Sequence, residues 1–142
     1  MFDQSIKSIM EPKKFLTAPP QTTVTDAAHL MAKKNVGAVL VVQDEQLLGI
    51  FSERDAVFRV IAKGRDPAAT LLSDVMTASP KTLSPSHSYG HALLIMQENG
   101  FRHVPIMENN RPVGIVSSRN AMDPDLEEFV FEARRREHLR QS

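Results

Sequence analysis

The chain has 142 residues, enough for one ordinary domain or for two small intertwined ones. Its 17 basic and 17 acidic residues give a formal net charge of zero, so no overall field attracts it to nucleic acid or to a membrane. Cysteine is absent, which excludes disulfides, thiolate zinc sites and thiol redox chemistry. Because the sequence has neither a membrane-spanning apolar run nor the apolar segment of a signal peptide, we expect a cytoplasmic protein.

The first part of the chain predicts a helix, an extended segment and a second helix. Apolar residues at helical spacing predict a short helix within residues 3–10 that packs back on the body of the protein. The prolines of residues 17–20 predict an extended segment, because proline lacks the amide donor of a central strand. A helix is predicted over residues 25–34, with Thr25 as its N-cap.

Two strands and a helix are expected next. Residues 38–42 form an apolar, β-branched run, which is typical of a strand buried on both faces. After a turn, residues 47–52 are predicted to return as the partner strand. The following helix, which ends at Gly64, is expected to bury its apolar residues: Val57, Val60 and Ile61.

The second half of the chain predicts the same order of elements. A segment at residues 81–83 leads to a helix over residues 90–99 and to strands at residues 103–107 and 113–117. A last helix follows from residue 123, with acidic residues in its first turns and arginines late, an order that complements the helix dipole. Its apolar stripe must be buried, either on its own body or on a neighbouring subunit.

This repetition is an internal duplication with an offset of 65 residues. The stretch Gly49–Asp55 returns as Gly114–Asn120: in both, a glycine and two apolar residues precede a serine, two polar residues and an acid or its amide. The offset aligns residues 17–55 with 82–120 without a gap. Nine positions are identical, against roughly two or three expected by chance. They are Thr17/Thr82, Pro20/Pro85, Ala27/Ala92, Met31/Met96, Val39/Val104, Gly49/Gly114, Ile50/Ile115, Ser52/Ser117 and Arg54/Arg119.

A duplicated α/β unit that ends in this motif resembles the cystathionine-β-synthase (CBS) domain, which usually occurs in tandem as a Bateman module. Val75-Met76-Thr77 and the strand at 102–106 add to the resemblance. It implies an α/β fold of two β-α-β-β-α repeats, over residues 5–65 and 66–122, packed about a pseudo-twofold axis. Residues 123–142 would form a C-terminal amphipathic helix. Asn120 departs from the family, which usually has aspartate at this place.

The motif allows two interpretations. In one, Ser52 caps a helix and Asp55, three positions later, supports its first turn. In the other, the carboxylate of Asp55 accepts hydrogen bonds from both hydroxyls of a ribose, as the acid of dinucleotide-binding folds does. Two copies, each preceded by Gly-Ile, favour the second interpretation, because a cap alone does not require the glycine.

The resemblance implies two ligand clefts, each built from the motif of one repeat and a strand of the other. The first nucleotide-binding set would be Ser52, Arg54, Asp55, Thr82, Arg102, His103, Val104 and Pro105. The second and weaker set would be Thr17, Gly37, Ala38, Val39, Ser117, Arg119 and Asn120.

The two predicted clefts are unequal in charge. The first has an anionic ribose partner, Asp55, and two potential phosphate donors, Arg102 and His103. The second has the neutral Asn120. Because a charge-assisted hydrogen bond contributes about 1.5–3 kcal/mol, its loss weakens binding about tenfold or more. We expect the first cleft to be the principal site and the second to be weak or empty.

Two functions follow from these observations. The first is a non-catalytic regulatory module, paired as a homodimer, that senses AMP, ADP or ATP and acts on an unknown target protein; NAD and S-adenosylmethionine also fall within the family's range. The second is a ligand-free dimerisation and docking protein for an enzyme or transporter.

The sequence does not favour other functions. An enzyme is not expected, because the sequence shows no nucleophile–base pair and no phosphate-binding loop. Nucleic-acid binding is not favoured either, because no aromatic residues are interleaved with the late arginines. No metal site is predicted, since His87 and His91, four apart as in a helical metal pair, have no acidic residue beside them.

Overall fold

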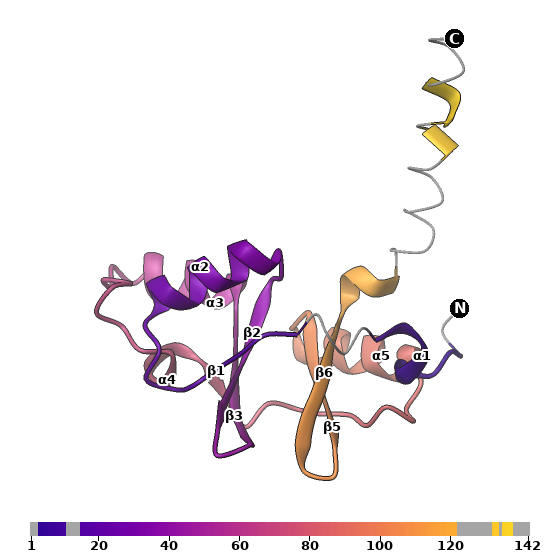
Figure 1. Cartoon of the computed structure of the whole chain (residues 1–142), viewed down its shortest axis with the longest axis horizontal. Coiled ribbons are helices and arrows are strands. Elements are labelled where there is room, and N and C mark those ends of the chain that lie inside the picture. The colour runs from indigo at the N-terminus through magenta and orange to yellow at the C-terminus, as the bar shows by residue number, and fades with distance from the viewer. Residues whose placement is uncertain (1–2, 11–14, 122–131, 134, 138–142) are drawn as a thin grey trace.

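The protein consists of two α/β repeats placed side by side (Figure 1). The computed structural model describes residues 3–10, 15–121, 132–133 and 135–137. The first half contains α1 (Ile6–Ile9), β1 (Thr17–Ala18), α2 (Val24–Lys34), β2 (Ala38–Gln43), β3 (Gln46–Ser52), α3 (Glu53–Asp55) and the π-helical η2 (Ala56–Ile61). The second contains α4 (Leu72–Val75), β4 (Thr77–Ala78), α5 (Tyr89–Asn99), β5 (His103–Glu108), β6 (Arg111–Ser117) and the 3₁₀ turn η3 (Ser118–Ala121). The predicted fold class is confirmed.

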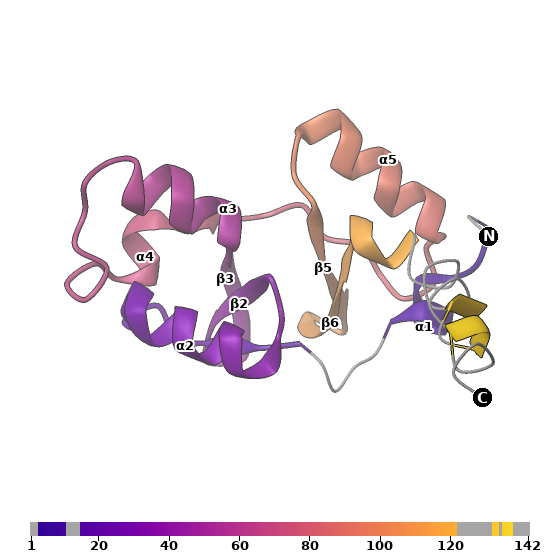
Figure 2. The same ribbon diagram turned by 90° about the horizontal axis from the view of Figure 1, so that it is seen from above.

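Among the described residues, the sheets of the two repeats have the same design but differ in the strands that pair. In the first, β1 pairs parallel with β2, β2 pairs antiparallel with β3, and β3 pairs antiparallel with β4. In the second, β5 and β6 form an antiparallel hairpin, and the first strand is reduced to a single parallel bridge between Leu83 and Ile106. Figure 2 shows α2, α3 and α4 grouped around β2 and β3, and α5 beside β5.

Strand β2 is buried on both faces, as its apolar run predicts. Val39 and Val41 belong to the core of the first repeat, together with residues of α2 and η2. Ala38 and Leu40 point the other way, into a small cluster that includes Ile115 from β6 of the second repeat. Alternate residues of one strand therefore supply the core of a repeat and the interface between the two repeats.

Helices α2 and α5 begin at equivalent caps. The Oγ1 of Thr23 accepts a hydrogen bond from the amide of Asp26 at 3.2 Å, and the Oγ of Ser88 accepts one from the amide of His91 at 3.1 Å. The predicted N-cap at Thr25 is wrong: that residue lies inside α2. The actual cap, two residues earlier, has the extended backbone that an N-cap requires.

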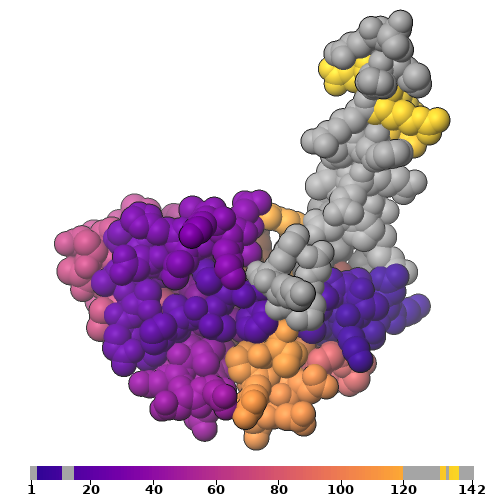
Figure 3. All heavy atoms as spheres, in the orientation of Figure 1, coloured from indigo at the N-terminus to yellow at the C-terminus, as the bar shows by residue number. Residues whose placement is uncertain are grey.

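The short helix at the start of each repeat packs on the other repeat. Ile6 of α1 is buried with residues of α5, β5 and β6, and the amide of Ile6 donates to the carbonyl of His87 at 2.9 Å. Conversely, Leu72 and Val75 of α4 are buried in the core of the first repeat. Figure 3 shows the indigo atoms of α1 against the second repeat, away from the purple first repeat. The two repeats are thus linked by an exchange of helices as well as by β-strand packing.

This exchange explains the glycine of the repeated motif. A Cβ on Gly49 would lie 2.6 Å from Sδ of Met76 and 2.7 Å from the backbone oxygen of Thr77, in the segment that follows α4. A Cβ on Gly114 would similarly collide with Met10, which follows α1. The glycines are therefore needed for the close approach of the crossing segments, which is a packing requirement and not evidence for a ligand.

The helix after β3 is less buried than its apolar spacing predicts. Val60 is buried in the core of the first repeat. Val57 and Ile61, however, are 50% and 68% exposed, and Phe58 beside them is 56% exposed. The prediction that Val57 and Ile61 are buried is wrong for the single chain, because no other element covers that face among the described residues. Most of the predicted C-terminal helix, residues 123–142, lies outside the described residues.

Candidate functional site

The repeated motif of the first repeat forms the junction between β3 and α3. Ser52 ends the strand in an extended conformation, and its Oγ accepts a hydrogen bond from the amide of Asp55 at 3.3 Å. In return, Oδ2 of Asp55 accepts hydrogen bonds from the amide of Ser52 at 2.9 Å and from its hydroxyl at 3.2 Å. This reciprocal pair is a capping box. The capping interpretation of the motif is therefore correct, and any ligand contact of Asp55 must coexist with it.

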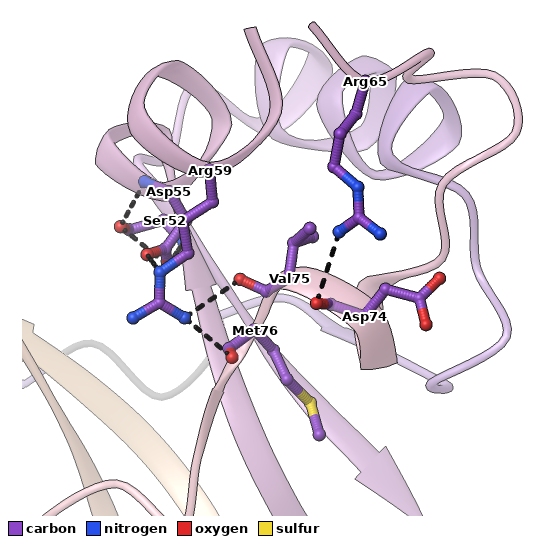
Figure 4. A network of polar contacts seen from close by, with 7 residues as sticks. All are labelled: Ser52, Asp55, Arg59, Arg65, Asp74, Val75 and Met76. Atoms are coloured by element: carbon purple, nitrogen blue, oxygen red, sulfur yellow. Dashed lines mark hydrogen bonds and ion pairs between the residues drawn. The ribbon is translucent and has the colours of Figure 1, made fainter. Parts of the chain in front are cut away.

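Arg59, one turn further along the helix, engages the second oxygen of this carboxylate. Its Nε lies 3.5 Å from Oδ1 of Asp55, and its Nη1 donates to the carbonyls of Val75 at 3.3 Å and Met76 at 2.9 Å (Figure 4). The side chain of Asp55 is 13% exposed and that of Arg59 is 48% exposed. Arg59 thus connects the motif acid of the first repeat to the segment that crosses to the second.

An open cleft of about 820 Å³ lies in front of this junction, between the two repeats. Its lining comes from the end of β3, α3 and η2 on one side, and from residues 77–81 and 99–103 on the other. The basic lining residues Arg54, Arg59, Lys81 and Arg102 outnumber the acidic ones, Glu53 and Asp55. Apolar walls are supplied by Ile50, Val57, Phe58 and Phe101. A cleft with apolar walls and an excess of cations suits a ligand that has a flat apolar part and an anionic part.

The structure brings most of the first predicted set together. Ser52, Arg54, Asp55, Arg102 and His103 all line the cleft, although their two groups are about fifty positions apart in sequence. The remaining three do not line it. Val104 and Pro105 are fully buried on opposite faces of β5, with Val104 in the core of the second repeat, and Thr82 is exposed outside the cleft.

Sequence reasoning missed other lining residues, Arg59 and Phe58 among them. Arg59 lies four residues after Asp55, the spacing at which an acid and a base meet on a helix, so this signal was available in the sequence. Phe58 stacks under Arg54, whose Cζ lies 5.0 Å from the ring centroid. Lys81, in the segment before the second repeat, carries no such local signal.

His103 lies where the two repeats meet. It is half-buried at the start of β5, and a Cβ on Gly37 would lie 3.4 Å from its Nε2 and 3.1 Å from Oε1 of Glu53. Burial lowers the pKa of His103 below its usual value of 6.5; Glu53 opposes this shift, whereas the nearby Arg119 and Arg102 reinforce it. At neutral pH the ring is therefore predominantly uncharged, so the phosphate donor expected from sequence at this position is an imidazole N–H without a positive charge.

The second predicted set is less uniform. Ala38 and Val39 are buried, so their side chains face packed interiors. The carbonyl of Gly37 accepts a hydrogen bond from the amide of Glu53 at 2.9 Å, and the carbonyl of Arg102 accepts the equivalent bond from the amide of Ser118 at 3.0 Å. These matching bonds preserve the symmetry of the two repeats. Thr17 and Arg119 are exposed and Ser117 is half-buried, while the side chain of Asn120 lies outside the described residues. A ligand role for this set stays a prediction.

His87 and His91, four residues apart as in a helical metal pair, contact each other. The rings of His87 and His91 stack with their centroids 5.4 Å apart, and Nδ1 of His87 accepts a hydrogen bond from the amide of Ser84 at 3.0 Å. Within the described part of the chain, no three histidine, aspartate or glutamate side chains are grouped to hold a metal ion. Among the same residues, no helix combines the length and apolar character needed to cross a bilayer.

Two α/β repeats that exchange their first helices and enclose a cleft define a paired-repeat module. A family model described as "CBS domain" matches residues 6–62 and again residues 72–124. The CBS domain-containing protein YhcV of Bacillus subtilis is 36% identical over 113 residues, which cover 80% of this chain and 79% of YhcV. The chain belongs to the CBS domain family and is a tandem CBS pair, a regulatory module. It spans only 14% and 19% of two other relatives, from Schizosaccharomyces pombe and Arabidopsis thaliana.

Solved structures agree with this assignment. A conserved protein from Pyrococcus horikoshii has a TM-score of 0.80 and 28% identity, covering 88% of this chain and 94% of that one. The CBS domain pair of the protein MJ0100, solved in complex with 5′-methylthioadenosine and S-adenosyl-L-methionine, has a TM-score of 0.76 and 23% identity, covering 84% of this chain and 98% of that one. The second likeness concerns the fold alone.

Proposed function

We propose that this chain is a non-catalytic regulatory module that binds an adenine nucleotide in the cleft between its two repeats and transmits binding to a partner protein. The observation that carries the proposal is the composition of the cleft. It combines the motif acid Asp55, four basic side chains and an apolar wall within one volume of about 820 Å³. These are the groups that a ribose, a phosphate and a base require, respectively.

AMP, ADP and ATP are the first ligands to test, with NAD and S-adenosylmethionine next. Support for an adenosine-containing ligand comes from MJ0100, which has this fold and was solved with two such molecules. The excess of basic over acidic lining residues favours ligands that carry phosphate. The cleft built from the second predicted set, with Asn120 in place of the acid, is proposed to bind weakly or not at all.

Transmission requires that the ligand bind one arrangement of the repeats better than another. The cleft is lined from both repeats, and Arg59 joins its acid to the carbonyls of the crossing segment at residues 75–76. A ligand that contacts both walls therefore favours one relative orientation of the repeats. A target protein bound to the outer surface of the repeats would respond to this change in orientation.

A thermal-shift panel tests the proposal. At a concentration one hundred times its Kd, a ligand stabilises the native state by about 2.7 kcal/mol, which raises Tm by roughly 5–10 °C for a chain of this size. We expect this rise with at least one adenine nucleotide and not with the matching guanine nucleotide. Arg102→Met should reduce it, whereas Arg111→Met should not, because Arg111 lies in β6 and does not line the cleft. The absence of any shift at millimolar nucleotide would contradict the proposal.

The second candidate is a ligand-free dimerisation and docking protein. It is favoured by the exposed apolar face of η2, formed by Val57, Phe58 and Ile61, and by the hydrogen bonds that Asp55 already makes without a ligand. Ile61, the most exposed of the three, does not line the cleft, so a homodimer that contacts the chain through Ile61 is compatible with both functions. Ile61→Asp should then convert the dimer to a monomer in light scattering, whereas Lys63→Asp, a change just beyond this face, should not.

A further inference from the structure

Arg59 is the cation of the cleft whose guanidinium is held in place by the fold. Its Nη1 donates to two backbone carbonyls, those of Val75 at 3.3 Å and Met76 at 2.9 Å. Two carbonyl partners on one nitrogen fix the plane of the guanidinium. The edge that carries Nε then faces Asp55, with Nε 3.5 Å from Oδ1 (Figure 4). Because the side chain remains 48% exposed and lines the cleft, a ligand can reach this edge.

The other basic residues of the cleft are not anchored in this way. Among the described residues, the side chains of Arg54, Lys81 and Arg102 donate no hydrogen bond to a protein acceptor; Arg54 lies on the ring of Phe58 instead. A flexible cation loses rotamer freedom when it binds an anion, whereas an anchored one has already lost it on folding. A planar guanidinium with fixed orientation also matches phosphate geometry better than an ammonium does.

We propose that Arg59 is the phosphate-recognising residue of the cleft and that it makes the cleft discriminate nucleotides from nucleosides. This inference rests on the proposed adenine-nucleotide function. Asp55 accepts the ribose hydroxyls, and the adjoining edge of Arg59 donates to the phosphate of the same ligand while Nη1 stays on its two carbonyls. Because Asp55 and Arg59 are already in contact, one ligand can bind its sugar to the carboxylate and its phosphate to the guanidinium at the same time. In the absence of a ligand, the pair neutralises itself.

The test compares AMP with adenosine by isothermal titration calorimetry. In Arg59→Met we expect AMP to bind about tenfold more weakly or worse, the loss of one charge-assisted contact, while adenosine binds within about threefold of wild type. Arg59→Lys keeps the charge but cannot span carbonyl and phosphate as the planar fork does, so its AMP affinity should be intermediate. Arg65→Met is the matched control, because Arg65 also donates to a carbonyl of this crossing region, that of Asp74 at 3.5 Å, without lining the cleft.

The ratio of AMP affinity to adenosine affinity distinguishes phosphate binding by Arg59 from a purely structural role of this residue. If Arg59 only holds the crossing segment in place, Arg59→Met weakens both ligands by the same factor and the ratio is unchanged, which overturns the inference. An unchanged AMP affinity in Arg59→Met overturns it too. If the wild type binds AMP and adenosine equally, phosphate recognition is refuted while nucleoside binding stands. If the wild type binds no adenine compound at all, the proposed function itself fails.

Discussion

Replacement of Asp55 by alanine should lower the stability of the protein even before any nucleotide is added. The substitution leaves the amide of Ser52 without its acceptor at 2.9 Å and breaks the capping box of α3. Loss of a cap costs about 0.5–2 kcal/mol. The pair with Arg59 adds little, because the arginine is 48% exposed and its charge is screened by water. A total of about 1–2 kcal/mol corresponds to a decrease in Tm of roughly 3–8 °C.

The matched substitution Asp55→Asn separates this structural role from ligand binding. The amide oxygen of asparagine can still accept from the Ser52 amide, so stability should fall less than in Asp55→Ala. Its loss of charge should nevertheless weaken nucleotide binding about tenfold or more, as much as in the alanine variant. Asn120 at the equivalent position of the second motif provides the natural precedent for this exchange.

The assay measures Tm without ligand and then the increase produced by nucleotide, for wild type and both variants. Without ligand, Tm should decrease in the order wild type, Asp55→Asn, Asp55→Ala. The increase with nucleotide should be small in both variants. An Asp55→Ala protein with the wild-type Tm in the absence of ligand would refute the capping argument. An Asp55→Asn protein that binds nucleotide as tightly as wild type would refute the role of the carboxylate as ribose acceptor.

Three further results are expected. Gly49→Ala should destabilise the protein by about 1–3 kcal/mol in chemical denaturation, because the added Cβ would lie 2.7 Å from a backbone oxygen. The control is Gly64→Ala. Gly64 has a φ of +68° and open space around it, so this change should cost only the left-handed backbone strain of about 1–2 kcal/mol. Burial lowers the pKa of His103, so just below pH 6.5 the unfolded chain binds more protons than the folded one. The free energy of unfolding should therefore decrease as pH falls through this value. In His103→Gln this decrease should be smaller. Glu45→Ala should change stability by less than about 0.5 kcal/mol, because its pair with Arg111 at 3.0 Å links two side chains that are 69% and 66% exposed; a larger loss would mean that this pair holds the two repeats together.

Local patterns in the sequence were sufficient for the architecture. An offset of 65 residues, the apolar run at β2 and the turn residues between strands predict two equal α/β units, because strand burial and turn chemistry depend on neighbours in the chain. The same patterns identified Ser52 and Asp55 as a pair. The four main strands begin and end within two residues of their predicted bounds. The errors at this level concern the ends of elements. For α2, Thr23 and Thr25 are both suitable N-cap residues, and the structure uses Thr23.

The sequence by itself therefore determined the duplication, the fold class and the motif acid. Only the tertiary structure decided that each repeat donates its first helix to the other, that the motif glycines admit Met76 and Met10, and that Asp55 is shared between a helix cap and Arg59. It also decided that Val104 and Pro105 are buried while Arg102 and His103 face a cleft. The physical reason is that helix and strand periodicity reflects contacts along the chain, whereas these features depend on which distant segments meet when two sheets pack against each other.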